Sequence, residues 1–209
     1  MQGLIQQISA VRKTEIRKLV GERLRQFSEL HKQGNAEWFS ELCFCILTAN
    51  STAKKGIQIQ NALGTKGFLQ LPERQLAKKL KLLGHRFYNK RAEFIAKARA
   101  YKNIKDKILS FKSEFEARDW LAQTVLGIGY KEASHFLRNV GFRNLAILDR
   151  HILSLMHEHR MLAEKPKSLN RQRYLDAEQK LSRLAIAARL SQAELDLFLW
   201  FLKTGKVLK

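Results

Sequence analysis

Two residues of this sequence have the types and the setting for chemistry on a sugar carbon. Lys131 directly follows a turn with two glycines, LGIGY, and Asp149 comes 149 − 131 = 18 residues later, after the apolar run LAIL. A neutral lysine amine is a nucleophile, and a fixed carboxylate stabilises a sugar carbon that becomes electron-poor as its base departs. The pair is therefore a candidate nucleophile and a candidate charge stabiliser.

Each residue also has a simpler explanation. Lys131 would contact a phosphate or lie in solvent, and Asp149 would be the N-cap of the helix that RHILSLM predicts. A neutral lysine at pH 7 costs about 4.6 kcal/mol in water, and a helix N-terminus and partial desolvation lower that cost while phosphates raise it. Both interpretations of Lys131 stay open. The two interpretations of Asp149 are compatible, since a carboxylate that caps a helix is held in place and can also stabilise a charge.

The glycines indicate how the lysine is positioned. Gly127 and Gly129 flank Ile128 between the apolar segment WLAQTVL and the amphipathic segment YKEASHFLRNV. Glycines permit a tight turn with positive φ, and Ile128 would fill the angle between two helices. Amides from Gly129 onward would then face outward, where a phosphate binds well. The pattern predicts a helix-hairpin-helix over residues 114–140 that contacts a nucleic-acid backbone; the alternative is an ordinary connection between two helices.

Composition favours a nucleic-acid partner. The 209 residues include 39 Lys and Arg against 19 Asp and Glu, a net charge of +20, and 45% are hydrophobic, which excludes a disordered chain. The charge is spread along the chain and so belongs to a folded face. No apolar run approaches the roughly 18 residues of a membrane span, and the N-terminus lacks a signal-like apolar stretch. We expect a cytoplasmic protein associated with DNA.

Metal and cofactor chemistry is not expected from the side chains. Cys43 and Cys45 are the only cysteines, and on a helix their side chains point roughly 200° apart. His157 and His159 have the same spacing. We predict no side-chain metal site, no cofactor, and two buried free thiols in a reducing compartment.

Helical patterns dominate the chain and predict an all-α fold of roughly ten helices. Apolar positions repeat at i, i+3, i+4 and i+7 within residues 181–188, Leu76, Leu80 and Leu83 form a second stripe that Gly84 ends, and Ser191 with Glu194 fits a capping box. We expect two helical lobes around a DNA-binding cleft. Lobe one would be approximately residues 1–48 plus 150–209, and lobe two approximately 49–149.

The wording LGIGYKEASHFLRNVG…LAILDRHIL, in a chain that ends on a lysine, resembles the helix-hairpin-helix DNA glycosylase superfamily with lyase activity. It is most similar to the small prokaryotic branch, the type-2 8-oxoguanine DNA glycosylase/lyases, over essentially the full length. Leu126 departs from the proline that many relatives carry there, which predicts a less rigid turn. A C-terminal four-cysteine cluster is absent from the sequence, which argues against the branch that acts on oxidised pyrimidines.

The resemblance implies a reaction. Lys131 would attack C1′ of the damaged nucleotide, displace 8-oxoguanine and form a Schiff base, and β-elimination would nick the strand. Asp149 would assist base departure and proton shuttling. The nucleotide must be flipped out of double-stranded DNA for this chemistry, which needs no cofactor and is expected of a monomer.

The resemblance also implies further site residues. Phe87 and Trp200 would stack on the base, and the carboxylate of the terminal residue Lys209 would contact it; without the resemblance the aromatics would be core residues and Lys209 a frayed end. Asn50 would fill the gap left by the flipped base, or else be a buried or capping asparagine. The hairpin pattern and positive charge, apart from the resemblance, give the remaining expected DNA contacts: Gly127, Ile128, Gly129, Arg138 and Arg143. A monovalent cation would bind the backbone carbonyls of Gln123, Val125 and Ile128.

Two alternatives remain open from the sequence. A related lyase could use the same lysine on a different damaged base, with a different pocket. A non-catalytic helix-hairpin-helix module could bind the DNA backbone alone, although such binding requires neither Lys131 nor Asp149.

Overall fold

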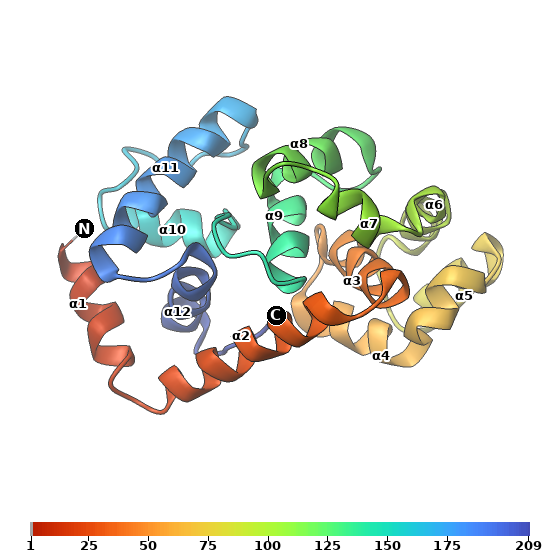
Figure 1. Ribbon diagram of the computed structural model, residues 1–209, viewed down its shortest axis with the longest axis horizontal. Helices are drawn as coiled ribbons and strands as arrows, with labels where there is room; N and C mark the ends of the chain where they lie inside the picture. The colour runs from red at the N-terminus through yellow and green to blue at the C-terminus, as the bar shows by residue number, and fades with distance from the viewer. Residues whose placement is uncertain (1) are drawn as a thin grey trace. The chain divides into compact units, whose positions relative to one another are not determined.

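The computed structural model describes residues 2–209, which form twelve α-helices, one 3₁₀ turn and no strand (Figure 1). The all-α prediction is confirmed, with two helices more than the pattern indicated. No helix within these residues is long and apolar enough to cross a membrane. In chain order the elements are α1 (Gln2–Val11), α2 (Ile16–Lys32), α3 (Asn35–Thr48), α4 (Ala53–Gln70), α5 (Glu73–Leu82), α6 (Tyr88–Ala98), the 3₁₀ turn η1 (Arg99–Tyr101), α7 (Ile104–Leu109), α8 (Glu114–Thr124), α9 (Tyr130–Asn139), α10 (Arg150–Glu158), α11 (Arg171–Ala188) and α12 (Gln192–Thr204).

The first compact unit contains the chain up to Ser28 and Gly141–Lys209. Within it, α12 packs against α1, α10 and α11. The stripe on α11 is buried as its spacing predicts, and Ser191 and Glu194 form the predicted capping box that begins α12. Both helices are therefore set by local signals, and their apolar faces make the core of this unit.

The second compact unit contains Glu29–Val140. Its central element is α3, which packs against α4, α6, α7 and α9 and is buried on all sides from Trp38 to Thr48. Cys43 and Cys45 are buried free thiols on α3, and burial raises the pKa of the Cys43 thiol. Gly84, just beyond α5, has the positive φ (76°) expected of the residue that ends that helix.

The division between the units differs from the expected lobes. The units divide at residues 28/29, within α2, and at 140/141, whereas the sequence suggested 48/49 and 149/150. Helix α3 belongs to the second unit because its all-round apolar surface is covered by helices of that unit. The segment 141–149 belongs to the first unit because side chains of α11 hold it, as described below.

The predicted helix-hairpin-helix lies entirely within the second unit. Ser113 caps α8 by accepting the amide of Glu116, a short turn follows Thr124, and α9 begins at Tyr130. Helices α8 and α9 pack against each other. Ile128 is only 4% exposed, as expected of a residue that fills the angle of the motif.

Candidate active site

The hairpin between α8 and α9 is closed by a backbone hydrogen bond from the Ile128 amide to the Val125 carbonyl, 3.1 Å long. Gly127 has a φ of 84°, the left-handed region that favours glycine. Gly129 has a φ of −102°, so the turn needs only one of its two glycines for its backbone angle. A Cβ atom on Gly127 would also collide with the ring of Phe94 on α6. The turn is therefore held from both sides, by its own backbone and by α6.

The first turn of α9 has no capping side chain at its N-cap position. Gly129 is the N-cap residue and offers no side-chain acceptor to the first amides of the helix. These amides and the positive end of the helix dipole favour an anion. Leu126 is half exposed in the hairpin. The arrangement suits a phosphate of a nucleic-acid backbone.

Lys131 lies in this first turn and is paired with its neighbour. Its ammonium nitrogen Nζ is 2.9 Å from Oε1 of Glu132, and the two side chains are 28% and 14% exposed. Arg91 on α6 is buried and lies within electrostatic range of Glu132; burial lowers the pKa of its guanidinium, while the Glu132 carboxylate raises it. The lysine side chain is therefore largely buried and held beside a carboxylate.

Asp149 begins α10, as its N-cap interpretation predicted. Its Oδ1 accepts the amides of His151 and Ile152, both at 2.8 Å, and its Oδ2 accepts the indole N–H of Trp200 at 3.0 Å. The Trp200 ring also stands edge-on to His151, with 5.7 Å between ring centroids. Three donors therefore fix the carboxylate, and one of them is a predicted substrate-binding aromatic.

The segment before Asp149 is tied to α11. The Tyr174 hydroxyl donates to the Ala146 carbonyl at 2.7 Å and accepts the Leu148 amide at 3.4 Å. The buried Glu178 accepts the Ala146 amide at 2.9 Å. Irregular backbone in a buried place needs such partners. Two side chains of α11 therefore set the point at which α10 starts.

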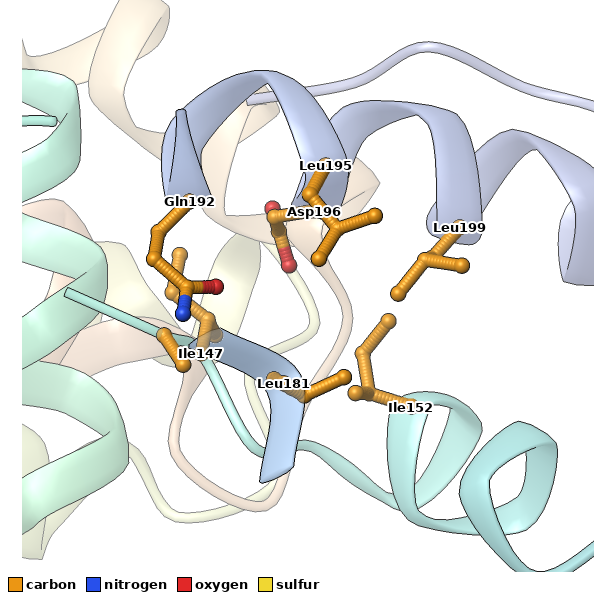
Figure 2. Close-up of a pocket in the computed structure, with 8 residues that line it drawn as sticks. Ile147, Ile152, Leu181, Gln192, Leu195, Asp196 and Leu199 are labelled. Carbon is orange, nitrogen blue, oxygen red and sulfur yellow. The ribbon is translucent and has the colours of Figure 1, made fainter. Parts of the chain in front are cut away.

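A narrow, mostly aliphatic pocket lies beneath the start of α10 (Figure 2). Ile152, whose amide holds Asp149, points its side chain toward Leu181 and Leu199 there. Trp200 and Lys209 are not among its lining residues. The pocket belongs to the core that anchors α10.

Phe87 is positioned by a buried histidine of its own unit. His85 donates from Nε2 to the Leu47 carbonyl at 2.9 Å, and its Nδ1 accepts the Phe87 amide at 3.2 Å. Burial lowers the pKa of His85, which favours the neutral ring that both bonds require. The guanidinium of Arg86 lies over the Phe87 ring, 4.5 Å from its centroid. Phe87 is thus a partly exposed ring at the start of α6, not a core residue.

Asn50 is exposed in the turn after α3 and has a φ of 58°. Asparagine is among the residues that tolerate this region. It is neither buried nor an N-cap, since Thr52 caps α4. Arg91 donates to the preceding carbonyl, that of Ala49, at 2.6 Å. Arg91 therefore lies against the hairpin at Gly127 and also supports the turn that presents Asn50.

The two arginines expected at DNA have different settings. Arg138 is only 5% exposed and bonds the Asn139 amide oxygen through Nε and Nη2. Asn139 in turn donates to the buried Glu41 at 2.6 Å. Arg138 is therefore a structural residue within α9, because its guanidinium is engaged inside the unit. Arg143 is exposed, and its Nη2 donates a long hydrogen bond of 3.5 Å to the Ser28 hydroxyl.

The remaining predicted positions, those of the cation site and of the C-terminal tail, follow the ends of α8 and α12. Gln123 is on the last turn of α8 and Val125 is its C-cap residue, where carbonyls lack helical partners and suit a cation. The carbonyl of Val125 already accepts the Ile128 amide. Val207, Leu208 and Lys209 are partly buried after α12. The tail is therefore partly buried and not a fully exposed end.

The predicted site residues fall into two sets, one in each unit. The second unit contains Lys131, the hairpin, Phe87 and Asn50, and the first contains Asp149, Trp200, Arg143 and Lys209. The sequence did not reveal His85, Arg91, Glu132 or Tyr174. The only signal was the acidic residue next to Lys131, because hydrogen bonds from distant segments leave no local pattern.

Comparisons with known proteins agree with this geometry. Residues 20–190 match the family model described as 8-oxoguanine DNA glycosylase. The chain is 52% identical to the 8-oxoguanine DNA glycosylase/AP lyase of Methanocaldococcus jannaschii over 206 residues, 99% of each chain. The structure of that enzyme in complex with a 15mer DNA containing 8-oxoguanine superposes with a TM-score of 0.97, at 51% identity and 99% coverage of both chains.

A bacterial relative gives the same result. The 8-oxoguanine DNA glycosylase of Thermotoga maritima has a solved structure that matches with a TM-score of 0.94 at 41% identity, over all of this chain and 99% of that one. The matches in sequence and in structure both extend over the whole chain. The chain belongs to the 8-oxoguanine DNA glycosylase family.

Proposed function

We infer that this protein is an 8-oxoguanine DNA glycosylase/AP lyase of base excision repair, and we propose that Lys131 is its nucleophile. The observation that supports this assignment is the position of Lys131 in the first turn of α9, largely buried and next to the amides that follow the glycine N-cap. A general DNA-binding module needs those amides but no largely buried lysine.

The proposed substrate is double-stranded DNA that contains 8-oxoguanine, bound by a monomer in the cytoplasm. The M. jannaschii relative has been solved with a 15mer DNA that contains 8-oxoguanine, and the net charge of +20 favours a polyanion. Backbone contacts are assigned to Gly127, Gly129 and Arg143, and Asn50 is assigned to the gap left by the flipped base. A monovalent cation at the carbonyls of Gln123, Val125 and Ile128 would add positive charge beside a phosphate.

The proposed chemistry begins with attack of the neutral Lys131 amine on C1′. The glycosidic bond breaks, the base leaves with its electron pair, and the sugar opens to a Schiff base with the lysine. β-Elimination then breaks the bond to the 3′ phosphate. Asp149 is assigned the stabilisation of positive charge on the sugar, because three N–H donors hold its carboxylate in place. Neither step needs a cofactor.

Phe87, Trp200 and the carboxylate of Lys209 are assigned to the base. Trp200 and Phe87 are each oriented by a hydrogen-bonded partner, and the tail that ends in Lys209 is partly buried. A C-terminal tag should therefore slow excision of 8-oxoguanine more than cleavage at a preformed abasic site. Equal slowing of both reactions would remove Lys209 from the pocket.

The decisive experiment is borohydride trapping on a labelled duplex with one 8-oxoguanine opposite cytosine, beside the undamaged duplex. We expect a covalent adduct with the lesion duplex alone, mapped to Lys131 by peptide mass spectrometry. Lys131→Gln should bind the duplex yet form no adduct.

Two results would contradict the proposal in different ways. Excision and nicking by Lys131→Gln at the wild-type rate would exclude Lys131 as the nucleophile. An adduct with abasic DNA but not with 8-oxoguanine DNA would support the lyase activity and exclude 8-oxoguanine as the base that is removed.

A further inference from the structure

A carboxylate beside the nucleophile is unexpected at this place. The protein has 39 basic and 19 acidic residues, and the start of α9 is the proposed phosphate site. A negative charge there repels DNA and weakens binding. Glu132 nevertheless lies in the first turn of α9, in contact with Lys131. A compensating role in the reaction would explain it.

The geometry holds this carboxylate in one place. Its Oε1 is 2.9 Å from Nζ of Lys131, and its Oε2 folds back over Gly129, 3.3 Å from where a Cβ would stand. The side chain of Glu132 is 14% exposed. Arg91, anchored on the Ala49 carbonyl, lies within its electrostatic range.

A purely structural explanation accounts for only part of this. An acidic residue in the first helical turn stabilises the positive end of the helix dipole. That role requires neither contact with the nucleophile nor burial, and an exposed carboxylate would serve it equally well. The contact with Lys131 is the feature that it leaves unexplained.

We propose that Glu132 is a further catalytic residue, the base that takes the proton from the Lys131 ammonium so that the amine can attack. This inference rests on the proposed function, in which Lys131 is the nucleophile. It assigns a role to a residue that the reaction scheme above does not use.

The transfer balances without any added reagent. One N–H bond of the Lys131 ammonium breaks, an O–H bond forms on the Glu132 carboxylate, and the nitrogen keeps the electron pair. That pair forms the bond to C1′ while the electrons of the glycosidic bond leave with the base. The base anion then takes the proton from Glu132, which restores the carboxylate.

Removal of water makes the transfer feasible. In water an ammonium and a carboxylate are both better solvated than their neutral forms, but a desolvated site favours the neutral pair. Both side chains are already more than two thirds buried, and bound DNA would exclude further water.

Asp149 is less suited to this step. Three N–H groups already bond its two oxygens, so a proton would have to compete with them. Glu132 instead has an oxygen directed at the lysine. The two carboxylates therefore take different tasks, one the proton of the nucleophile and the other the charge on the sugar.

The test compares Glu132→Gln and Glu132→Ala in single-turnover excision of 8-oxoguanine and in cleavage at a preformed abasic site. Glutamine keeps an oxygen that accepts a hydrogen bond from the ammonium, but it cannot accept the proton. Glu93→Gln is the matched control, since it removes one acidic charge from the same unit, where Glu93 pairs with Lys90 and Lys97. Duplex affinity and melting temperature are measured for every variant.

We expect both Glu132 variants to slow both reactions by about 100-fold, and to similar extents. Affinity should not fall in either Glu132 variant, because the charge that opposes DNA is removed, so weaker binding would not explain the slower rates. Added formate, at constant ionic strength, should restore part of the rate in Glu132→Ala, where there is space for it, and not in Glu132→Gln. A variant that does not fold would be replaced by Glu132→Asp, which keeps the base and should retain most of the rate.

Three results would overturn the inference. If Glu132→Gln excised at a nearly normal rate while Glu132→Ala was slow, Glu132 would only orient the amine. If both variants were faster than the wild type, Glu132 would hold Lys131 back from the reaction. If the Glu132 variants reacted at the rate of Glu93→Gln, the only role left for Glu132 would be to stabilise the positive end of the α9 dipole. Lys131→Gln, run in parallel, separates these results from a failure of the proposed function, because an active Lys131→Gln would reject the nucleophile itself.

Discussion

The starts of α9 and α10 carry the two central residues of the proposed mechanism, and they are built in opposite ways. Helix α10 is capped by its own Asp149, which accepts two first-turn amides and an indole N–H. Helix α9 begins at Gly129, which has no side chain to cap it, after a hairpin that needs the left-handed Gly127. One helix start is capped by its own carboxylate, and the other has no capping side chain at its N-cap position.

The difference matches what each residue must do. A charge stabiliser gains from a fixed position, so using its carboxylate as a cap costs nothing in function. A nucleophile that works beside a DNA phosphate needs the amides of its helix for that phosphate. The amides of a helix N-terminus therefore bind a side chain in the first unit, and in the second unit we expect them to bind a phosphate.

Asp149→Asn should separate the cap from the charge. The asparagine oxygen still accepts the amides of His151 and Ile152, but the negative charge is lost. We expect excision to fall by about 100-fold, equivalent to about 3 kcal/mol, with little change in melting temperature. Single-turnover kinetics and thermal unfolding measure the two effects. An unchanged rate would mean that Asp149 is only a cap.

Gly127→Ala should distort the hairpin that precedes α9. Its φ of 84° and the collision with Phe94 both oppose a side chain. We expect a loss of roughly 2 kcal/mol in unfolding free energy and weaker duplex binding. Gly64→Ala is the control, since Gly64 has a φ of 61° but no atom within 4 Å of its Cβ position. Equal losses in the two variants would leave only backbone strain as the cause.

Trp200→Phe should leave the Asp149 carboxylate at the start of α10 less firmly held. Phenylalanine keeps an aromatic face but loses the N–H that bonds Oδ2 of Asp149 at 3.0 Å. We expect excision to fall by about 10-fold, because a hydrogen bond to a charged group is worth about 1.5 kcal/mol or more. Single-turnover excision measures the effect. A full loss of excision would instead indicate that the indole itself recognises the base.

His85 should make the setting of Phe87 depend on pH. Its pKa is lowered in the folded protein, so folding favours the neutral ring. This contribution to stability is present above the unfolded value of about 6.5 and is lost as pH falls below it. We expect the smallest effect of the four, a lower melting temperature at pH 5 than at pH 7.

His85→Gln is the control for this titration. Glutamine can still donate to the Leu47 carbonyl but does not titrate, so its melting temperature should vary less over this range. Glu93, whose pKa is lowered to about 2 by its bonds to Lys97 and Lys90, titrates well below it. An identical pH dependence in both proteins would assign the effect to other histidines.

Much of the fold could be predicted because its signals are local. The capping box of Ser191, the cap by Ser113, the apolar stripe of α11 and the limits of the helix-hairpin-helix each arise from residues within one or two turns. The N-cap role of Asp149 belongs to the same class. The unit boundaries were displaced because the partners of α3 and of the segment 141–149 are distant in sequence.

The candidate site was predictable only in part, for the same reason. Lys131 and Asp149 were visible because each adjoins a recognisable pattern. Arg138 was assigned to DNA from its charge alone, and its burial beside Asn139 and Glu41 had no sign in the sequence. His85 and Tyr174 were missed because their roles consist of single bonds to distant backbone atoms.

The sequence by itself determined the all-α class, the basic character, the hairpin turn and the two reactive side chains, since helix periodicity, net charge and glycine placement act over a few residues. The tertiary structure decided which of those side chains are held and by what. Asp149 acquires Trp200 from 51 residues away, Phe87 acquires the buried His85 and its anchor on Leu47, and Arg91 joins the hairpin to the turn at Asn50. Such bonds depend on the packing of whole helices, which no short stretch of sequence encodes.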